Sequence, residues 1–503
     1  MAIATVSPGA AERPVADDAA ARCRFIDGRL PEDSLYSDVN REPPPGSRAT
    51  WRVSPEPFWL TQEAVGFLQR LGQDLLAFYR ATNALYLAAV RGRQPAWVAD
   101  YYDRGRPHQL VDYGRLNRTR RHLPGVLRPD LFLTDAGFVA TELDSVPGGI
   151  GFGASLSQPY AELGYPLVGG AAGMLDGFAA VLQSAAGLVE PAPDTVAAVV
   201  VSEESGDYWP EMRWLAQTLT ARGRPVHAVR PQDVRFTEEG LFVPEGGSPG
   251  PRDSAETDPG ARLVPIDVLY RFFELFDIKN VPKWELMLYA TKKQTVALTP
   301  PVKTYLEEKL TFALLHHPAL APFWHRELTP DRFERLRAVL PLTWVLDPRP
   351  LPPHASVPGL ELAGKPVQSW EQLARLTQKE RQLVVKPSGF DPAAWGSRGV
   401  RVGHDLPEDQ WAATVHQALE RFDTTRYVLQ RFQSVRRTTV EWYDFAAGEV
   451  RRLAGRARLT PYYFVVDDEA RLGGVTATVV PIDKKLIHGM VDAVIAPCAV
   501  KPA

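Results

Sequence analysis

A short segment near Ala136, LRPDLFLTDAGFVATELDS, most constrains what this chain can fold into. Two apolar runs, VLRPDLFL and FVATEL, flank an Asp-Ala-Gly loop that ends at Gly137. A three-residue loop whose last position is a left-handed glycine is typical of a β-hairpin. The sequence therefore predicts two antiparallel strands joined at this loop.

A turn centred on Ala136 determines which side chains face each other. The predicted cross-strand pairs are Phe132 with Ala140, Asp130 with Glu142, and Arg128 with Asp144. Because side chains alternate along a strand, the four charged groups project from one face. Three adjacent carboxylates repel one another unless a cation joins them, and one arginine cannot neutralise all three. Oxygen ligands favour Mg²⁺ or Mn²⁺, ions that usually arrive with nucleotide phosphates. The alternative is a solvated hairpin with a surface salt bridge.

The glycine-rich run PGGIGFG, residues 147–153, directly follows the hairpin. Glycines let a backbone approach a ligand closely and offer exposed N–H groups to anions. This run favours a binding site over a solvated hairpin.

Composition sets broad limits on the class of protein. A chain of 503 residues with 45% hydrophobic content can bury a large core and is expected to form two or three lobes. The net charge of −3, with both signs interspersed, gives no electrostatic footprint for nucleic acid. No stretch approaches the roughly 20 apolar residues of a membrane span, and no secretion signal is evident. Cys23 and Cys498 have no partners at metal-ligand spacing, which favours a reduced cytoplasmic location.

Hydrophobic patterns predict an α/β protein of layered lobes. Residues 61–91 have the three- and four-residue spacing of a helical pair. The run TVAAVVVSEES, the helix PEMRWLAQTLTARG and the run PVHAVR form a strand–helix–strand unit. Residues 245–262 are polar and turn-forming, and we expect a mobile excursion there. A long helix is expected from Thr299, with Pro300 in its first turn.

A second group of residues surrounds Lys386, which ends the β-branched run QLVVKP. A loop containing Gly389, Gly396 and Gly399 follows it. A lysine in this position can meet a phosphate as a point charge while the loop folds over a nucleotide. The pattern is not a P-loop, and a solvated turn lysine is the alternative.

Two weaker candidates lie on either side of Lys386. Lys303 follows Pro300-Pro301 and is a candidate phosphate ligand, with a surface helix lysine as the alternative. The run YVLQRF, which contains Gln430 and Phe432, can offer its backbone to an adenine edge, although a core strand has the same pattern.

Together these residues resemble the circularly permuted ATP-grasp ligases, in particular the synthetase domain of glutathionylspermidine synthase. That family has an Arg-x-Asp strand followed across a turn by a Glu-x-Asn strand. Arg128-Pro129-Asp130 and Glu142-Leu143-Asp144 match this pattern, with Asp144 replacing the amide. The acidic hairpin precedes both lysines, the reverse of the order in unpermuted enzymes. The loop WGSRG departs from the family's tighter flap sequence.

The resemblance implies ATP and Mg²⁺ as cofactors and assigns a role to each residue. The implied metal ligands are Asp130, Glu142 and Asp144, the catalytic residue is Arg128, and the nucleotide-binding residues are Lys303, Lys386, Gly396, Ser397, Gly399, Gln430 and Phe432. The implied regions are a flexible segment over 1–50, a helical and metal-binding part over 51–185, a substrate-binding α/β lobe over 186–295, and ATP-binding lobes over 296–503.

The implied activity is ATP-dependent ligation of a small-molecule carboxylate to an amine through an acylphosphate. Two alternatives stay open: a nucleotide-binding pseudoenzyme or assembly subunit with a degenerate ATP-grasp fold, and a small-molecule phosphotransferase. Further candidates for substrate contacts, each with a structural alternative, are Glu203, Glu204, Ser205, Tyr208, Glu274, Asp277, Arg456 and Arg458.

Overall fold

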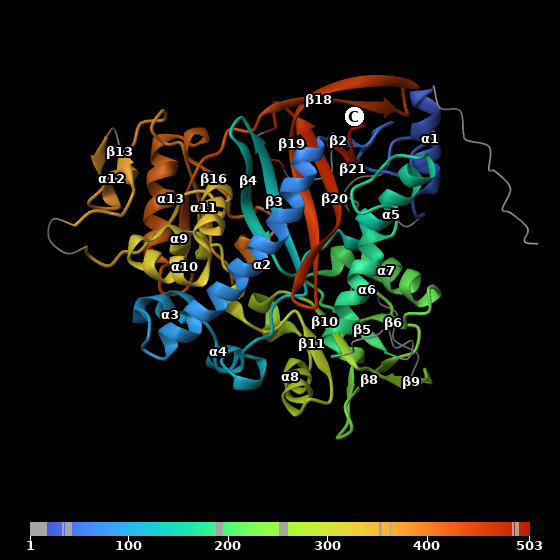
Figure 1. Cartoon of the computed structure of the whole chain (residues 1–503), viewed down its shortest axis with the longest axis horizontal. Helices are drawn as coiled ribbons and strands as arrows, with labels where there is room; N and C mark the ends of the chain where they lie inside the picture. The colour runs from blue at the N-terminus through green and yellow to red at the C-terminus, as the bar shows by residue number, and fades with distance from the viewer. Residues whose placement is uncertain are drawn as a thin grey trace, which may run out of the picture.

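A mixed sheet of eight strands forms the centre of the computed structural model, which describes residues 18–32, 35, 43–187, 195–250, 260–351, 355–362, 364–484, 487 and 492–502 (Figure 1). The strands follow the order β1 (Arg52–Val53), β21 (Val494–Val500), β20 (Glu469–Pro481), β19 (Glu449–Val466), β3 (Val126–Thr134) and β4 (Gly137–Asp144), while β18 (Arg437–Asp444) pairs with β19 and β2 (Phe58–Leu60) pairs with β21. Strands from the start of the chain thus complete a sheet whose other strands come from its end.

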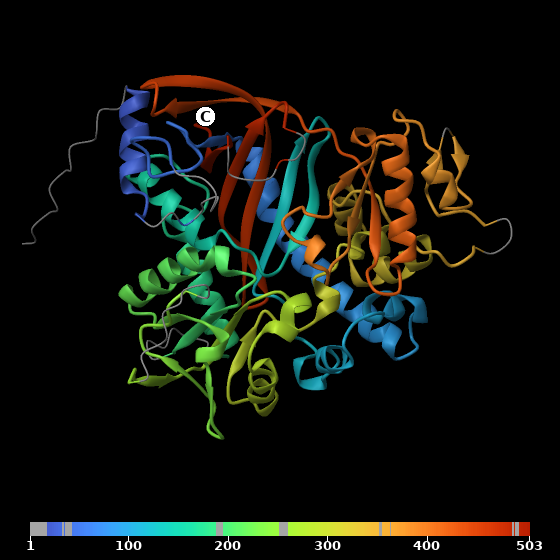
Figure 2. The ribbon, with the colours of Figure 1, turned by 180° about the vertical axis from the view of Figure 1, so that it is seen from behind.

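Helices cover both faces of the central sheet. Helix α2 (Gln62–Val90) crosses one face, in front of the strands in Figure 1 and behind them in Figure 2. Leu459 and Tyr463 of β19 are buried on the side of α2. Helices α5 (Ile150–Glu162) and α6 (Gly173–Ala185) cover the other face, where the neighbouring Tyr462 of β19 is buried. The alternation of side chains along β19 therefore separates an apolar core from the face that carries the candidate site.

Helix α2 corrects the prediction of a helical pair over residues 61–91. It is one helix of 29 residues, capped by the Thr61 side chain. A Cβ atom at Gly72 would lie 2.5 Å from the ring of Tyr463. The close packing of the helix on the sheet therefore requires a glycine at position 72, and Gly72 does not mark a turn.

A second lobe contains a parallel sheet of four strands. Its order is β11 (Ala297–Thr299), β10 (Val268–Phe272), β5 (Ala197–Val201) and β6 (Val226–Val229). Helix α7 (Trp209–Ala221) joins β5 to β6 and confirms the predicted strand–helix–strand unit. Helix α8 (Trp284–Lys293) and a small sheet of β7 (Arg235–Phe236), β8 (Leu241–Pro244) and β9 (Leu263–Pro265) complete the lobe. Residues 251–259 of the predicted mobile excursion lie outside the described residues.

A third lobe contains an antiparallel sheet in the order β12 (Thr343–Val345), β17 (Tyr427–Arg431), β15 (Leu383–Pro387) and β16 (Arg401–Val402). Helix α13 (Glu408–Glu420) packs in its core. The β-branched run that contains Lys386 forms strand β15. Beside them lie α12 (Glu371–Ala374), β13 (Glu361–Leu362) and β14 (Lys365–Pro366).

Short helices connect the lobes in place of the long helix predicted from Thr299. Residues 304–306 form a 3₁₀ turn, and α9 (Thr311–His316), α10 (Ala321–Glu327) and α11 (Pro330–Val339) follow. Pro300 and Pro301 exclude a helical start at Thr299, because a residue that precedes proline is disfavoured in the helical region.

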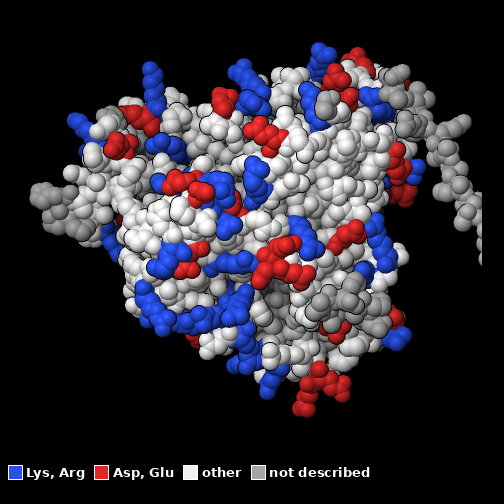
Figure 3. All heavy atoms as spheres, in the orientation of Figure 1, with Lys and Arg blue, Asp and Glu red and all other residues white. Residues whose placement is uncertain are grey.

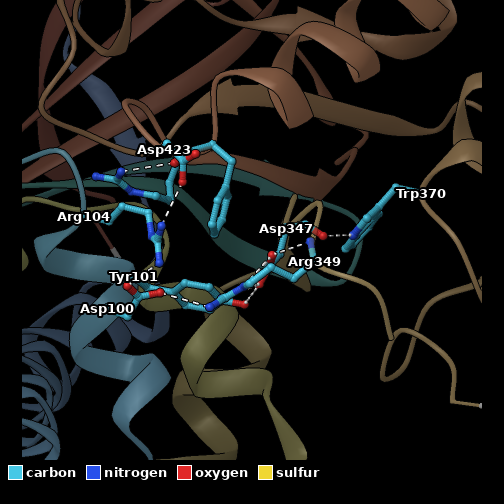
Figure 4. A network of polar contacts seen from close by, with 9 residues as sticks. Asp100, Tyr101, Arg104, Asp347, Arg349, Trp370 and Asp423 are labelled. Carbon is cyan, nitrogen blue, oxygen red and sulfur yellow. Dashed lines mark hydrogen bonds and ion pairs between the residues drawn. The ribbon is translucent and has the colours of Figure 1, made fainter. Parts of the chain in front are cut away.

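A network of ion pairs joins the third lobe to α3 (Ala96–Asp103), as Figure 4 shows. Helix α4 (His108–Gly114) follows α3 in the chain. Arg349, which follows β12, contacts Asp347 at 2.5 Å and Asp100 at 3.0 Å. Arg104 joins Asp100 at 2.7 Å to Asp423 at 2.8 Å. These contacts link the lobe that carries Lys386 to α3.

The predicted flexible segment over residues 1–50 contains an ordered helix. Helix α1 (Ala19–Arg29) buries Cys23 and Ile26 against α5 and the central sheet. Residues 1–17, 33–34 and 36–42 of this segment lie outside the described residues.

Candidate functional site

The charged hairpin forms as predicted, with one difference in register. Arg128 faces Asp144, and Asp130 faces Glu142. Phe132 pairs with Val139 and not with Ala140, because a bulge between Asp130 and Leu131 shifts the strands by one residue. The bulge leaves a two-residue turn at the tip and keeps all four charged groups on one face.

Each carboxylate of the hairpin is paired with a cation. Arg128 lies 2.9 Å from Asp144 and 3.7 Å from Asp130. Asp130 also contacts Arg458 at 3.0 Å, and Glu142 contacts Lys309 at 2.6 Å. Sequence reasoning counted only Arg128, because Arg458 and Lys309 come from distant segments. Within the described residues no group of three or more His, Cys, Asp or Glu side chains is arranged to hold a metal ion.

Burial and ion pairing shift the pKa values of these side chains in opposite directions. Burial alone lowers the pKa of Arg128, but Asp144 and Asp130 outweigh it and raise that pKa well above its usual value. Burial raises the pKa of Asp144, and the charge of Arg128 opposes this shift. The pKa of Lys309 is raised because the attraction of Glu142 exceeds the effect of burial.

The four charged residues open into a cavity of about 130 Å³. Its floor is the central sheet, and its walls come from the glycine run, from β10 and from the loop after Lys386. The residues that line it include Arg128, Asp130, Glu142, Asp144, Gly148, Gly149, Tyr208, Phe272, Glu274, Trp395, Gly396, Ser397, Arg458 and Thr460. We call this the hairpin cavity.

A second cavity of about 110 Å³ adjoins the first and contains Lys386. Asp130, Glu142, Ser397 and Arg458 line both cavities. The other lining residues include the apolar Val384, Val402, Phe432 and Val435. They also include the polar Gln430, Arg431 and Arg456. We call this the lysine cavity.

Lys386 is held at the junction of two sheets. Its ammonium group donates to the Thr141 carbonyl at 2.7 Å and to the Gln430 side-chain oxygen at 2.9 Å. Burial lowers its pKa to about 8, although the charge of Glu142 opposes this shift. Because an opposite charge favours the protonated form of a buried lysine, an anion bound in this cavity would stabilise the charged form of Lys386.

Lys303 lies in a different place from the one its sequence context predicted. Its side chain is 1% exposed and donates to Asn83 Oδ1 at 2.9 Å and to the carbonyls of Arg120 and His122 at 3.2 and 2.7 Å. It lines neither cavity. Lys309, six residues further along, contacts Glu142 and lines a small cavity that also contains Glu274. The sequence analysis did not consider Lys309 as a candidate.

The loop after Lys386 closes over the cavities. Gly396 and Ser397 line the hairpin cavity with positive φ angles of 62° and 59°, whereas Gly399 packs against Pro387 and lines neither cavity. Arg398 contacts Glu204 at 3.2 Å. The loop therefore rests on the lobe of the parallel sheet.

The glycine run uses its N–H groups internally. The amides of Gly149 and Gly151 donate to the carboxylate of Glu211 at 2.8 and 3.0 Å. Burial raises the pKa of Glu211 to about 7, and these backbone donors oppose the shift. The predicted anion at this run is thus a residue of the chain itself, and the run contributes the wall of the cavity.

Among the described arginines that line the two cavities, three have a buried Nε donor that makes no hydrogen bond. The Nε atoms of Arg128, Arg456 and Arg458 make no hydrogen bond in the structure. All three side chains line one or both cavities. Because an unsatisfied buried donor costs about 1–3 kcal/mol, this arrangement favours an anion bound between them.

The remaining candidates separate into two groups. Ser205, Tyr208 and Glu274 line the hairpin cavity. Asp277 accepts a hydrogen bond from Asn280 instead. Burial raises the pKa of Glu274 to about 8, and the neighbouring carboxylates of Glu307 and Asp144 add to this shift.

Charges of both signs are spread over the face seen in Figure 3, with basic side chains gathered toward its lower left. A larger cavity of about 550 Å³ is lined by Arg118, Arg121, Asp467 and Asp468 among others. It contains none of the residues that the sequence identified and none of the partnerless arginine donors. We therefore assign the candidate site to the hairpin and lysine cavities. None of the described helices combines the length and the apolar character that crossing a bilayer requires.

No protein-family model and no curated protein sequence matches this chain. Among solved structures, it is similar to a glutathione synthetase-like effector from Globodera pallida in its apo form, with a TM-score of 0.53 and 11% identity over 97% of this chain and 96% of that chain. A protein assigned as a gamma-glutamylcysteine synthetase from Methylobacillus flagellatus has a TM-score of 0.35 at 12% identity over 84% of each chain, too low to define a shared fold. The chain is therefore a mixed α/β protein with several sheets. Its fold is that of the glutathione synthetase-like effector.

Proposed function

We propose that this chain is an ATP-dependent carboxylate–amine ligase with a circularly permuted ATP-grasp fold like that of glutathionylspermidine synthase. One observation carries the proposal: the acidic hairpin and Lys386 line two adjoining cavities that share Asp130, Glu142, Ser397 and Arg458. A nucleoside triphosphate matches these two cavities, because it combines an apolar base with a charged phosphate chain.

Two features of the fold support this assignment. The glutathione synthetase-like effector has the same fold over nearly the full length of both chains. The hairpin β3–β4 precedes the lysine lobe in sequence yet pairs with β19 from the end of the chain. This is the arrangement expected when an ATP-grasp order is permuted.

The lysine cavity fits a nucleotide. Val384, Val402 and Phe432 offer an apolar surface to a base, and Lys386 lies where the phosphates would begin. The free donors of Arg456 and Arg458 offer the phosphates hydrogen bonds that the protein itself does not supply.

The donor set also fits Mg²⁺, which proteins usually bind through one or two carboxylates together with substrate phosphates and water. Two of Asp130, Glu142 and Asp144 would hold the ion, and Arg458 and Lys309 would then turn from these carboxylates to the phosphates. When bound, the ion neutralises charge on the phosphates and orients the γ-phosphoryl group.

The chain's own groups position the reaction. A substrate carboxylate in the hairpin cavity attacks the γ-phosphorus, and Arg128 stabilises the charge that develops on the transferred group. An amine then displaces phosphate from the acylphosphate. Glu274 lines the same cavity with a pKa of about 8, so its carboxylate can hold the proton that the amine releases. The loop over residues 396–399 excludes water while the acylphosphate exists.

An ADP-release screen of pooled amines against pooled carboxylates tests the proposal, with Asp130→Asn as the inactive control. We expect ADP only when an acid, an amine and MgATP are present together. A phosphorylated product that forms without amine would instead identify a phosphotransferase. Stabilisation by MgATP without ADP release from any pool would identify a nucleotide-binding pseudoenzyme.

A further inference from the structure

Two arginines and one glutamate are buried together near the end of strand β15. Arg106 lies between α3 and α4, Arg426 directly precedes β17, and Glu308 precedes α9. The side chains of Arg106 and Glu308 have no exposed surface, and Arg426 is 0% exposed. Glu308 pairs with Arg106 and accepts a hydrogen bond from Ser388 Oγ. The amide of Ser388 donates to the carbonyl of Arg426 at 2.8 Å, so the three charged residues come together at Ser388.

The two guanidinium groups offer more donors than the chain satisfies. Arg106 Nη2 pairs with Glu308, and Arg426 Nη1 donates to the Phe422 carbonyl at 3.3 Å. Within the part of the chain that the structure describes, Nε and Nη1 of Arg106 and Nε and Nη2 of Arg426 make no hydrogen bond. Because buried donors are normally satisfied, four such donors indicate a bound group that accepts hydrogen bonds.

Charge identifies this bound group as an anion, because the cluster contains two arginines and one carboxylate. Burial lowers the pKa of Arg426 to about 10, and the charge of Arg106 adds to this shift while Glu308 opposes it. Arg426 is therefore still protonated at neutral pH. The next charges, Arg104 and Asp100, pair with each other at 2.7 Å and leave the balance unchanged. Since buried charges are normally paired, one further negative charge is expected here.

The enclosure of the cluster limits the size of the anion. Neither arginine side chain is exposed to solvent, and the ring centre of Phe390 lies 4.6 Å from the guanidinium carbon of Arg106. We propose that a monovalent anion of chloride size binds the free donors of Arg106 and Arg426. This site is separate from the hairpin and lysine cavities, because neither arginine lines them. The proposal does not depend on the ligase activity.

The anion connects the segments that carry two lysines of the candidate site. Ser388 lies two residues beyond Lys386, and its carbonyl accepts a hydrogen bond from the Lys309 amide at 2.9 Å. Lys386 lines the lysine cavity, and Lys309 pairs with Glu142. An anion that binds only the folded chain stabilises this arrangement increasingly as its concentration rises.

Anomalous diffraction from crystals of the full chain grown in sodium bromide locates the anion. We expect a bromide peak within hydrogen-bond distance of donors from both Arg106 and Arg426. Bromide found at exposed positions alone would be an adventitious ion only, and this result would overturn the proposal.

Thermal unfolding tests the same site in solution, with chloride exchanged for the much larger gluconate at constant ionic strength. A hundredfold increase in chloride should raise the Tm of wild-type protein by about 2–3 °C. Arg426→Met should remove this response. Glu308→Gln should lower the half-saturating chloride concentration about fivefold, because it removes a like charge beside the anion. Arg375→Met, at an exposed arginine after α12, is the matched control and should keep the wild-type response.

An equal Tm in chloride and gluconate overturns the proposal, as does an unchanged chloride response in Arg426→Met. Glu308→Gln keeps the experiment decisive if Arg426→Met does not fold. A purely structural ion pair predicts that Glu308→Gln lowers the Tm with no gain in chloride affinity, and that outcome also rejects the anion site.

Discussion

Two buried lysines are held by oxygen acceptors in similar ways but face different surroundings. Lys386 donates to the Thr141 carbonyl and to Gln430, while Lys303 donates to Asn83 and to two backbone carbonyls. Burial lowers both pKa values, to about 8 and about 7. Only Lys386 also borders a cavity that it shares with carboxylates and partnerless arginine donors. A buried lysine with a shifted pKa is therefore not by itself evidence of a binding site. The distinguishing feature is whether the lysine also borders a cavity.

The change Lys386→Met should have the largest effect and should act on function. We expect MgATP affinity and ADP release to fall by about 10²–10³, the loss that follows removal of one preorganised electrostatic donor. The freed Thr141 carbonyl borders the cavity, where water can reach it, so the free energy of unfolding should change little.

Calorimetry with MgATP and the ADP-release assay measure the effect of Lys386→Met. Lys365→Met is the matched control, since Lys365 is an exposed lysine on β14 of the same lobe. Unchanged MgATP affinity in Lys386→Met would remove this lysine from the nucleotide site.

The change Lys303→Met should act on stability instead. It leaves Asn83 and the carbonyls of Arg120 and His122 without their donor in an enclosed environment, which we expect to cost about 1–3 kcal/mol of unfolding free energy. MgATP affinity should stay within twofold of wild type. Urea unfolding measures the first quantity and calorimetry the second, with the exposed Lys292→Met as control. A loss of MgATP affinity comparable to that of Lys386→Met would contradict the contrast between the two lysines.

Local sequence was sufficient to predict the parts of the site that depend on neighbouring residues. The pairing of Arg128 with Asp144 follows from one turn, and the position of Lys386 follows from one strand. The bulge after Asp130 could not be predicted, because it depends on how the hairpin fits against β19.

The contacts that complete the site join segments far apart in the chain. Arg458 reaches Asp130 across more than 300 positions, and Glu211 reaches the amide of Gly149 from another lobe. Lys303 follows two prolines as expected, yet its side chain turns inward because carbonyl acceptors are available there. Which of Lys303 and Lys309 faces the hairpin is decided by tertiary packing, and no local pattern distinguishes them.

The pH dependence of stability tests whether Lys303 is neutral in the folded chain. Lys303 has a pKa of about 7 in the folded chain, below the usual value of 10.5. Between these values the unfolded chain binds one more proton, so unfolding free energy should rise with pH by about 1 kcal/mol per unit. Urea unfolding between pH 7.5 and 9.5 should show this slope in the difference between wild type and Lys303→Met. The same difference taken with Lys365→Met should be flat. A flat result for Lys303→Met would mean that Lys303 stays protonated in the folded chain over this pH range.

The smallest expected effect comes from changes in the loop that closes the cavity of Lys386. These changes should not affect the surroundings of Lys303. Arg398 and Glu204 form an ion pair at 3.2 Å with side chains 53% and 34% exposed, and such pairs contribute at most about 1 kcal/mol. Arg398→Ala should therefore raise the KM for ATP two- to fivefold, because the open form of the loop gains population, while kcat changes less. Glu204→Gln should have the same effect, and the double variant should be no worse than either single change if the pair acts as a unit. Additive effects would show that the two residues act separately, and the loop would then close by the packing of Trp395 on Tyr208 alone.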